Sequence, residues 1–150
     1  MSEVDDEQDY CISFPLELVI AQTPVSAQAS GTKAKDEWKK TVGERAKAEI
    51  DRLRDWYDID DRPLMATIYY FPPGKMQGDI DNIIKPILDG MIGVVYLDDA
   101  VIEKVVAQKF EVGIDWKFSS PSSALQDAID RDKPVVYIMV EDDLDWREVQ

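Results

Sequence analysis

The sequence predicts an α+β fold, in which a two-layer mixed sheet is covered by helices mainly on one face. Segments with strand character alternate with helical patterns in the order β-α-β-α-β-(α)-β. Two of the helical patterns carry one apolar stripe, which is typical of helices that cover a sheet. The chain has 150 residues and 45% hydrophobic content, enough for one domain with its own core.

The first strand is expected within residues 10–22. Leu16, Leu18 and Ile20 occupy alternate positions there, and this period of two predicts a strand with one buried face. Pro15 cannot donate a ladder hydrogen bond, so it favours an edge or a bulge at the start of this strand.

Residues 23–32 are expected to form a loop, because they are rich in Ser, Ala and Gln and show no periodicity. Residues 33–57 form the longest helical pattern, with apolar residues at steps of three and four. The start of this helix is basic and suggests two interpretations, an ordinary solvated face or a patch that contacts DNA phosphates. The lysines concerned are Lys33, Lys35, Lys39 and Lys40.

The rest of the chain supplies the remaining elements of the sheet. Lys75 lies in the loop that leads into a second amphipathic helix, and its charge could also meet a phosphate. In chain order we expect a turn at 58–63, a strand at 64–71, a loop at 72–78, a strand at 101–112, a short helix at 124–131 and a strand at 134–140.

An acidic amphipathic helix is expected at residues 81–91. Asp79 stands where a helix N-cap belongs, and Pro86 is expected to kink the helix rather than break it. The apolar stripe consists of Ile80, Ile83, Ile84, Ile87, Leu88, Met91 and Ile92.

The polar side of this helix carries charges that can be interpreted in two ways. Taken alone, Asp81, Lys85 and Asp89 form a ladder of i, i+4 pairs, and Asp98 and Asp99 are turn residues. Taken together, crowded carboxylates repel one another unless a cation or a proton offsets them. The chain has no histidine, which excludes catalysis by histidine and leaves hard cations such as Mg²⁺ or Mn²⁺ as candidate cofactors.

At these positions the chain resembles the RusA-like Holliday junction resolvases. The resemblance implies a Mg²⁺-dependent endonuclease, with Mn²⁺ as a possible substitute, that cuts four-way or related branched DNA in recombination and repair. It also implies a homodimer, because a four-way junction needs two symmetric cuts. The matching residues are Asp79-Ile80-Asp81-Asn82, Lys85, Leu88-Asp89-Gly90 and Tyr96-Leu97-Asp98-Asp99.

The resemblance also implies a role for each polar residue. Asp79, Asp81 and Asp99 would be catalytic residues that hold the metal ions. Asp98 would be an accessory metal ligand, and Lys85 a catalytic or phosphate-contacting residue. The lysines near the start of the long helix and Lys75 would then be candidates for contacts with DNA.

Net charge is the main argument against DNA binding, since the chain carries −14 and phosphate attraction dominates affinity for nucleic acids. Much of this negative charge lies at the two ends of the chain. We expect both ends to be acidic tails that flank a nuclease domain at residues 10–140. Residues 1–9 carry five acidic and no basic side chains, and residues 141–150 carry five against Arg147.

Two other functions remain open. One is a binding module that keeps the fold without catalysis and offers an acidic surface to a protein partner. The other is a different metal-dependent phosphotransfer enzyme acting on nucleotides, although the chain has no Gly-rich phosphate loop.

A cytoplasmic protein without a membrane segment is expected. No apolar run approaches the 18 or so residues that a membrane helix needs, and residues 1–7 show no signal-peptide pattern. The single cysteine, Cys11, fits a reducing compartment.

Overall fold

The computed structural model describes residues 10–150, so the acidic tail expected at 1–9 lies outside the described residues. Its sheet has the strand order β1-β4-β2-β3, in which β2 and β3 run parallel and the other neighbours run antiparallel. The expected mixed sheet is therefore confirmed. The strands are β1 (Leu16–Ile20), β2 (Leu64–Phe71), β3 (Ile102–Lys109) and β4 (Val135–Glu141).

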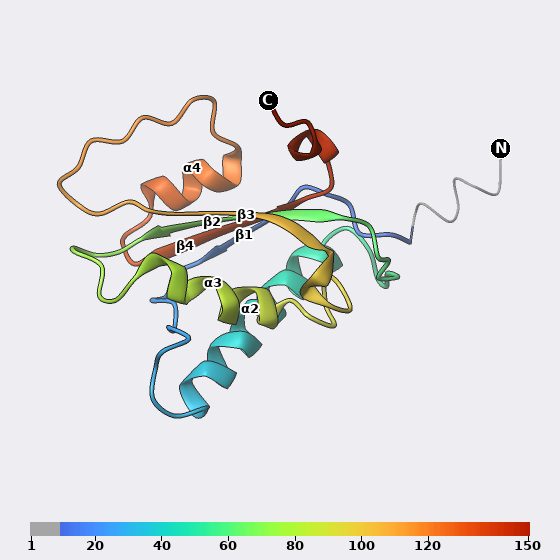
Figure 1. Ribbon diagram of the computed structural model, residues 1–150, viewed down its shortest axis with the longest axis horizontal. Helices are drawn as coiled ribbons and strands as arrows, with labels where there is room; N and C mark the ends of the chain where they lie inside the picture. The colour runs from blue at the N-terminus through green and yellow to red at the C-terminus, as the bar shows by residue number, and fades with distance from the viewer. Residues whose placement is uncertain (1–9) are drawn as a thin grey trace.

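The helices cover mainly one face of the sheet, as the sequence predicts. Figure 1 shows α2 and α3 on one side of the strands and α4 on the other. Short 3₁₀ helices precede α3 and β3 and follow β4. The helical elements are α2 (Lys33–Asp51), η1 (Ile80–Ile83), α3 (Ile84–Gly90), η2 (Asp99–Val101), α4 (Ser123–Asp130) and η3 (Leu144–Arg147). In the described part of the chain no helix is long and apolar enough to span a membrane.

The larger core lies between the sheet and the pair α2 and α3. Trp38 and Val42 of α2 and Ile87 of α3 are at most 2% exposed there. A smaller cluster under α4 contains Phe71 and Phe110, whose rings stack with centroids 4.8 Å apart. Burial of both sheet faces explains why the central strands β2 and β4 are almost entirely apolar, whereas the edge strand β3 has no buried residue and carries charged side chains.

Helix α2 ends at Asp51, six residues before the expected end at residue 57. The chain beyond it is held by residues that precede β1, because Tyr10 stacks on Trp56 at 4.4 Å and its carbonyl accepts the Asp58 N–H at 2.7 Å. Leu53, which continues the spacing of apolar residues along the expected helix, is 72% exposed. The same contacts shorten the first strand, since residues 10–13 run beside this segment and β1 begins only after Pro15.

The acidic helix begins as a 3₁₀ turn and becomes α-helical at Ile84. Pro86 has no N–H, so it cannot donate to the carbonyl of Asn82 as an α-helix requires. That carbonyl instead accepts the N–H of Ala27 at 2.7 Å, which ties the loop before α2 to the acidic helix. At the other end Ile92 is 41% exposed, because the helix stops at Gly90 before the expected stripe is complete.

Residues 141–150, expected as an acidic tail, include the last residue of β4 and all of η3. Glu103 of β3 accepts hydrogen bonds from Trp146 Nε1 at 2.8 Å and from Arg147 Nη2 at 2.7 Å. This end of the chain is therefore held against β3.

Candidate functional site

A row of alternating charges joins α2, α3 and η2. Lys85 Nζ lies 2.7 Å from Asp99 Oδ2 and 2.9 Å from Asp89 Oδ1, and Lys39 Nζ of α2 lies 3.9 Å from Asp89 Oδ2. We call these four residues the charge ladder. The sequence predicts two i, i+4 pairs, Asp81 with Lys85 and Lys85 with Asp89. Only the second forms among the described residues, because Lys85 bonds to Asp99 instead of Asp81, and Lys39 adds a contact to Asp89.

The ladder changes the proton affinity of its members. The hydrogen bond from Lys85 holds the pKa of Asp99 below its usual value, with a smaller opposing effect of burial. In turn the hydrogen bond with Asp99, followed by that with Asp89, raises the pKa of Lys85. Lys85 and Asp99 are therefore both charged at neutral pH.

Tyr96 is buried next to the charge ladder, and the site prediction did not include it. Its ring is fully buried, and its hydroxyl donates to the carbonyl of Leu88 at 2.6 Å. Burial raises the pKa of Tyr96, and the charges of Asp99 and Asp89 add to the effect. The sequence indicates Tyr96 only as the aromatic residue before the Asp98-Asp99 pair.

The other predicted carboxylates have different surroundings. Asp79 and Asp81 are exposed, and neither side chain makes a hydrogen bond or an ion pair with residues 10–150. Asp79 is the residue before η1, in extended backbone, but its side chain caps no N–H. Asp98 accepts the N–H of Ala100 at 2.9 Å, as the turn interpretation predicts.

The carboxylates suit a divalent cation in chemistry, because Mg²⁺ and Mn²⁺ prefer oxygen ligands and no side chain within residues 10–150 competes for Asp79 or Asp81. These carboxylates do not converge on one point. Among the described residues no group of three or more Asp, Glu, Cys or His side chains lies close enough to hold a metal ion. Asp99 in addition is occupied by Lys85.

The lysines expected to contact DNA fall into two groups. Lys39 is part of the ladder, and Lys40 pairs with Glu44 one turn later at 3.8 Å. Lys35 Nζ reaches the carbonyl of Ala27 at 3.5 Å. Lys33 and Lys75 are exposed and make no ion pair with the described residues.

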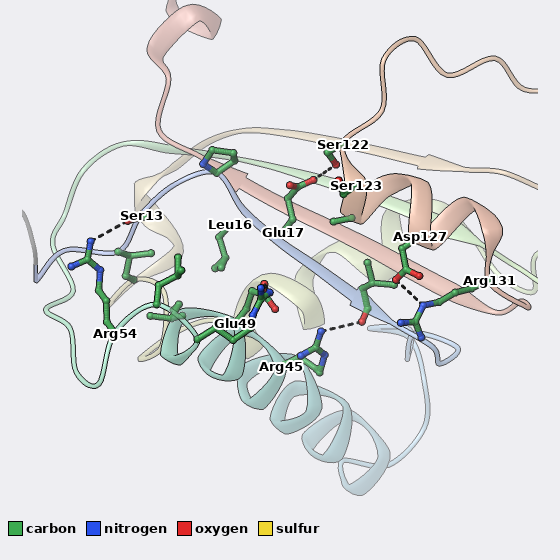
Figure 2. Close-up of a pocket in the computed structure, with 17 residues that line it drawn as sticks. Ser13, Leu16, Glu17, Arg45, Glu49, Arg54, Ser122, Ser123, Asp127 and Arg131 are labelled. Carbon is green, nitrogen blue, oxygen red and sulfur yellow. Dashed lines mark hydrogen bonds and ion pairs between the residues drawn. The ribbon is translucent and has the colours of Figure 1, made fainter.

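A cavity of about 690 Å³ lies elsewhere, along the free edge of β1 between α2 and α4 (Figure 2). None of the predicted site residues lines it. Four arginines do, three of them from α2 and the residues just after it and one from the end of α4, and no sequence pattern predicts that they share a cavity. Two of them are engaged by acidic neighbours, Glu49 and Asp127. The arginines are Arg45, Arg52, Arg54 and Arg131.

Comparison with known proteins gives one family match. The model of the family described as Endodeoxyribonuclease RusA matches residues 15–117, more than half of the chain. The matched range contains the charge ladder, Asp79, Asp81 and all the lysines expected to contact DNA. The search of curated proteins found no match.

Proposed function

Because the chain belongs to the RusA endodeoxyribonuclease family, we propose that it is a metal-dependent endonuclease that cleaves four-way or related branched DNA in recombination and repair. The family match over residues 15–117 is the observation that carries the proposal. The charge ladder supports the proposal, because it sets Lys85 of α3 between two carboxylates, Asp89 of the same helix and Asp99 of η2.

In this proposal Asp79, Asp81 and Asp99 would hold one or two Mg²⁺ ions, for which Mn²⁺ can substitute, with Asp98 as an accessory ligand. Their side chains would have to move together, because in the described residues they do not form a group close enough to hold a metal ion. When bound, such ions supply hydroxide from a coordinated water and offset charge on the phosphate. Lys85 presents its ammonium to the same phosphate. An electrostatic interaction that is stronger in the transition state than in the ground state accelerates cleavage.

Lys85 is well placed for this role because two carboxylates share it. Its ammonium bridges Asp99 and Asp89, so when Asp99 takes another partner, Asp89 still holds the lysine within one helical turn of Asp81. Lys39 stands on the far side of Asp89, where it limits the negative charge of that carboxylate. The ladder thus keeps one cation near the scissile phosphate.

A homodimer completes the proposal. One site makes one cut, and a four-way junction is resolved by two symmetric cuts, which a two-fold dimer supplies. Lys33, Lys35, Lys39, Lys40 and Lys75 would contact the phosphates of the DNA arms.

The net charge of −14 favours a second candidate, a module of the same fold that binds a basic protein through its acidic surface. The two candidates differ in what they bind. A nuclease binds and cuts junction DNA at moderate salt, whereas the module leaves junction DNA unbound and captures a basic partner.

The test is cleavage of a synthetic four-way junction in Mg²⁺, in Mn²⁺ and in EDTA. We expect cutting in both metals and none in EDTA, at paired positions on opposite strands. Lys85→Ala should abolish most of the cutting. Lys117→Ala, at an exposed lysine away from the site, is the matched control and should cut normally. Absence of metal-dependent cutting by the unaltered protein would refute the proposal.

A further inference from the structure

Beside Asp79 a cavity of about 400 Å³ opens between two loops, the one before α2 and the one after β2. Thr23, Pro24 and Ser26 line it from the first loop, and residues 72–79 from the second. Asp79 and Lys75, which have roles in the proposed cleavage reaction, are among its lining residues, but that reaction leaves the interior of the cavity unused. Its size falls in the range of about 300–1,000 Å³ that is usual for small-molecule pockets.

Both loops are fixed by hydrogen bonds to the framework, so the cavity is formed in advance. The N–H of Met76, in the second loop, donates to Glu111 Oε2 at 2.8 Å. The first loop is tied through Ala27 to the carbonyl of Asn82, which Pro86 leaves free. A pocket whose walls are held on both sides binds a ligand without first ordering a loop.

The interior of this cavity is apolar and its rim is polar. Tyr70, Met76 and Ile83 form the interior and are at most 7% exposed. Gln77 lies at the rim with an amide that can both donate and accept. Lys75, also at the rim, makes no direct ion pair with the described residues. The hydrogen bond from the Met76 N–H lowers the pKa of Glu111, and the charge of Lys75 helps to lower it. These features suit a flat heteroaromatic ring with hydrogen-bonding edges, attached to a phosphate.

We propose that this cavity takes one unpaired nucleobase of the DNA substrate, from the nucleotide next to the cleaved phosphate. Asp79 lines the cavity and is also a candidate ligand for the catalytic metal, so a phosphate held there places its neighbouring base at the cavity mouth. Strands at a junction crossover are the place where a base can leave its stack at low cost. Gln77 would read the edge of this base, and Lys75 would contact its phosphate. This inference rests on the proposed nuclease function.

Two tryptophan variants distinguish the cavity from the loop surface. Gln77→Trp places a ring at the rim, where it can fill the cavity. Gln28→Trp adds the same ring to an exposed position of the loop before α2 that does not line the cavity. Gln77→Ala leaves the cavity open but removes the amide, so the difference in cleavage rate between junctions that carry different bases at this position should shrink.

The binding experiment uses junctions in which one 2-aminopurine is moved through the crossover, with EDTA present. A base that leaves its stack and enters the cavity changes the fluorescence at one position next to the cleavage site. We expect this change with the unaltered protein and with Gln28→Trp, and its loss with Gln77→Trp. A response that survives in Gln77→Trp would overturn the inference.

The cleavage experiment compares an intact junction with one that lacks the base at that position. Gln77→Trp should cut the intact junction about tenfold more slowly, a factor that corresponds to about 1.4 kcal/mol. It should cut the abasic junction as fast as the unaltered protein does. Equal slowing on both junctions, or no slowing, would overturn the inference but leave the nuclease function intact. An unaltered protein that cuts no junction would overturn both.

Discussion

The contact between α2 and α3 is closed by two glycines, and we expect Gly90→Ala to separate these helices. A Cβ at Gly90 would lie 2.8 Å from the carbonyl oxygen of Lys39 and 2.9 Å from the Cβ of Val42. A Cβ at Gly43 would lie 2.7 Å from the carbonyl oxygen of Gly90, whereas ordinary contacts begin near 3.4 Å. The obstacles are mostly backbone atoms, which cannot rotate away, so the helices themselves must move.

The stability change can be bounded. Overpacking a tight contact costs about 1–3 kcal/mol. Alanine regains up to about 1 kcal/mol of helix propensity over glycine, and less at the last residue of a helix. We therefore expect Gly90→Ala to lose about 1–2 kcal/mol in urea unfolding. Cleavage should fall as well, because Lys39 and Asp89 stand on the two helices that separate.

Gly74→Ala is the matched control. Its Cβ would meet no atom within 4 Å, and its backbone is not in the left-handed region, so its stability should stay within about 0.5 kcal/mol of the unaltered protein. A Gly90→Ala protein as stable as Gly74→Ala and as active as the unaltered protein would refute the reasoning, because it would show that the helices adjust without cost.

Three further outcomes are expected. Lys85→Ala should leave junction binding largely intact and reduce single-turnover cleavage by orders of magnitude, and Asp89→Ala should reduce it less; equal losses that follow lowered stability would favour a plain surface ladder. Millimolar Mg²⁺ should raise the melting temperature, and Asp81→Asn should remove that rise without lowering stability in EDTA; a rise unchanged by the substitution would exclude this site. Hydrogen bonding to Arg147 lowers the pKa of Glu103 to about 2, so its contribution to stability is complete above about pH 4.5 and is lost as the pH falls toward 2; acid unfolding of Glu103→Gln should lack this component.

The element order and the strands after the first could be predicted because local sequence largely decides them. The eight residues of β2 have the predicted bounds, since β-branched and aromatic residues fill them and turn residues flank them. The end of α2 could not be predicted. It depends on the stacking of Tyr10 on Trp56, a contact between residues far apart in the sequence. Leu53 continues the helical spacing of apolar residues, but its side chain is exposed and does not pack in the core.

The sequence indicates which residues gather at the candidate site, but it indicates few of their contacts. Spacing along the helix predicts the pair of Lys85 and Asp89, because residues four apart share a helix face. The contact of Lys85 with Asp99 joins helix α3 to the start of β3. The sequence did not predict this contact, because Asp99 was interpreted as a metal ligand. The hydrogen bond from the Ala27 N–H to the Asn82 carbonyl could not be predicted either. Pro86 indicates only that one carbonyl lacks its helical donor.

The order of charges in the ladder couples the two ligands of the proposed reaction. Asp99 and Lys85 already neutralise each other, so a cation at Asp99 and a phosphate at Lys85 each have to replace the same contact. Once one ligand has broken it, the other binds without that cost, and each ligand therefore favours the other. Such coupling is reciprocal by thermodynamic necessity, so Mg²⁺ should tighten junction binding by the same factor as the junction tightens Mg²⁺ binding. Lys85→Ala leaves no contact to break, and in that protein the two affinities should become nearly independent.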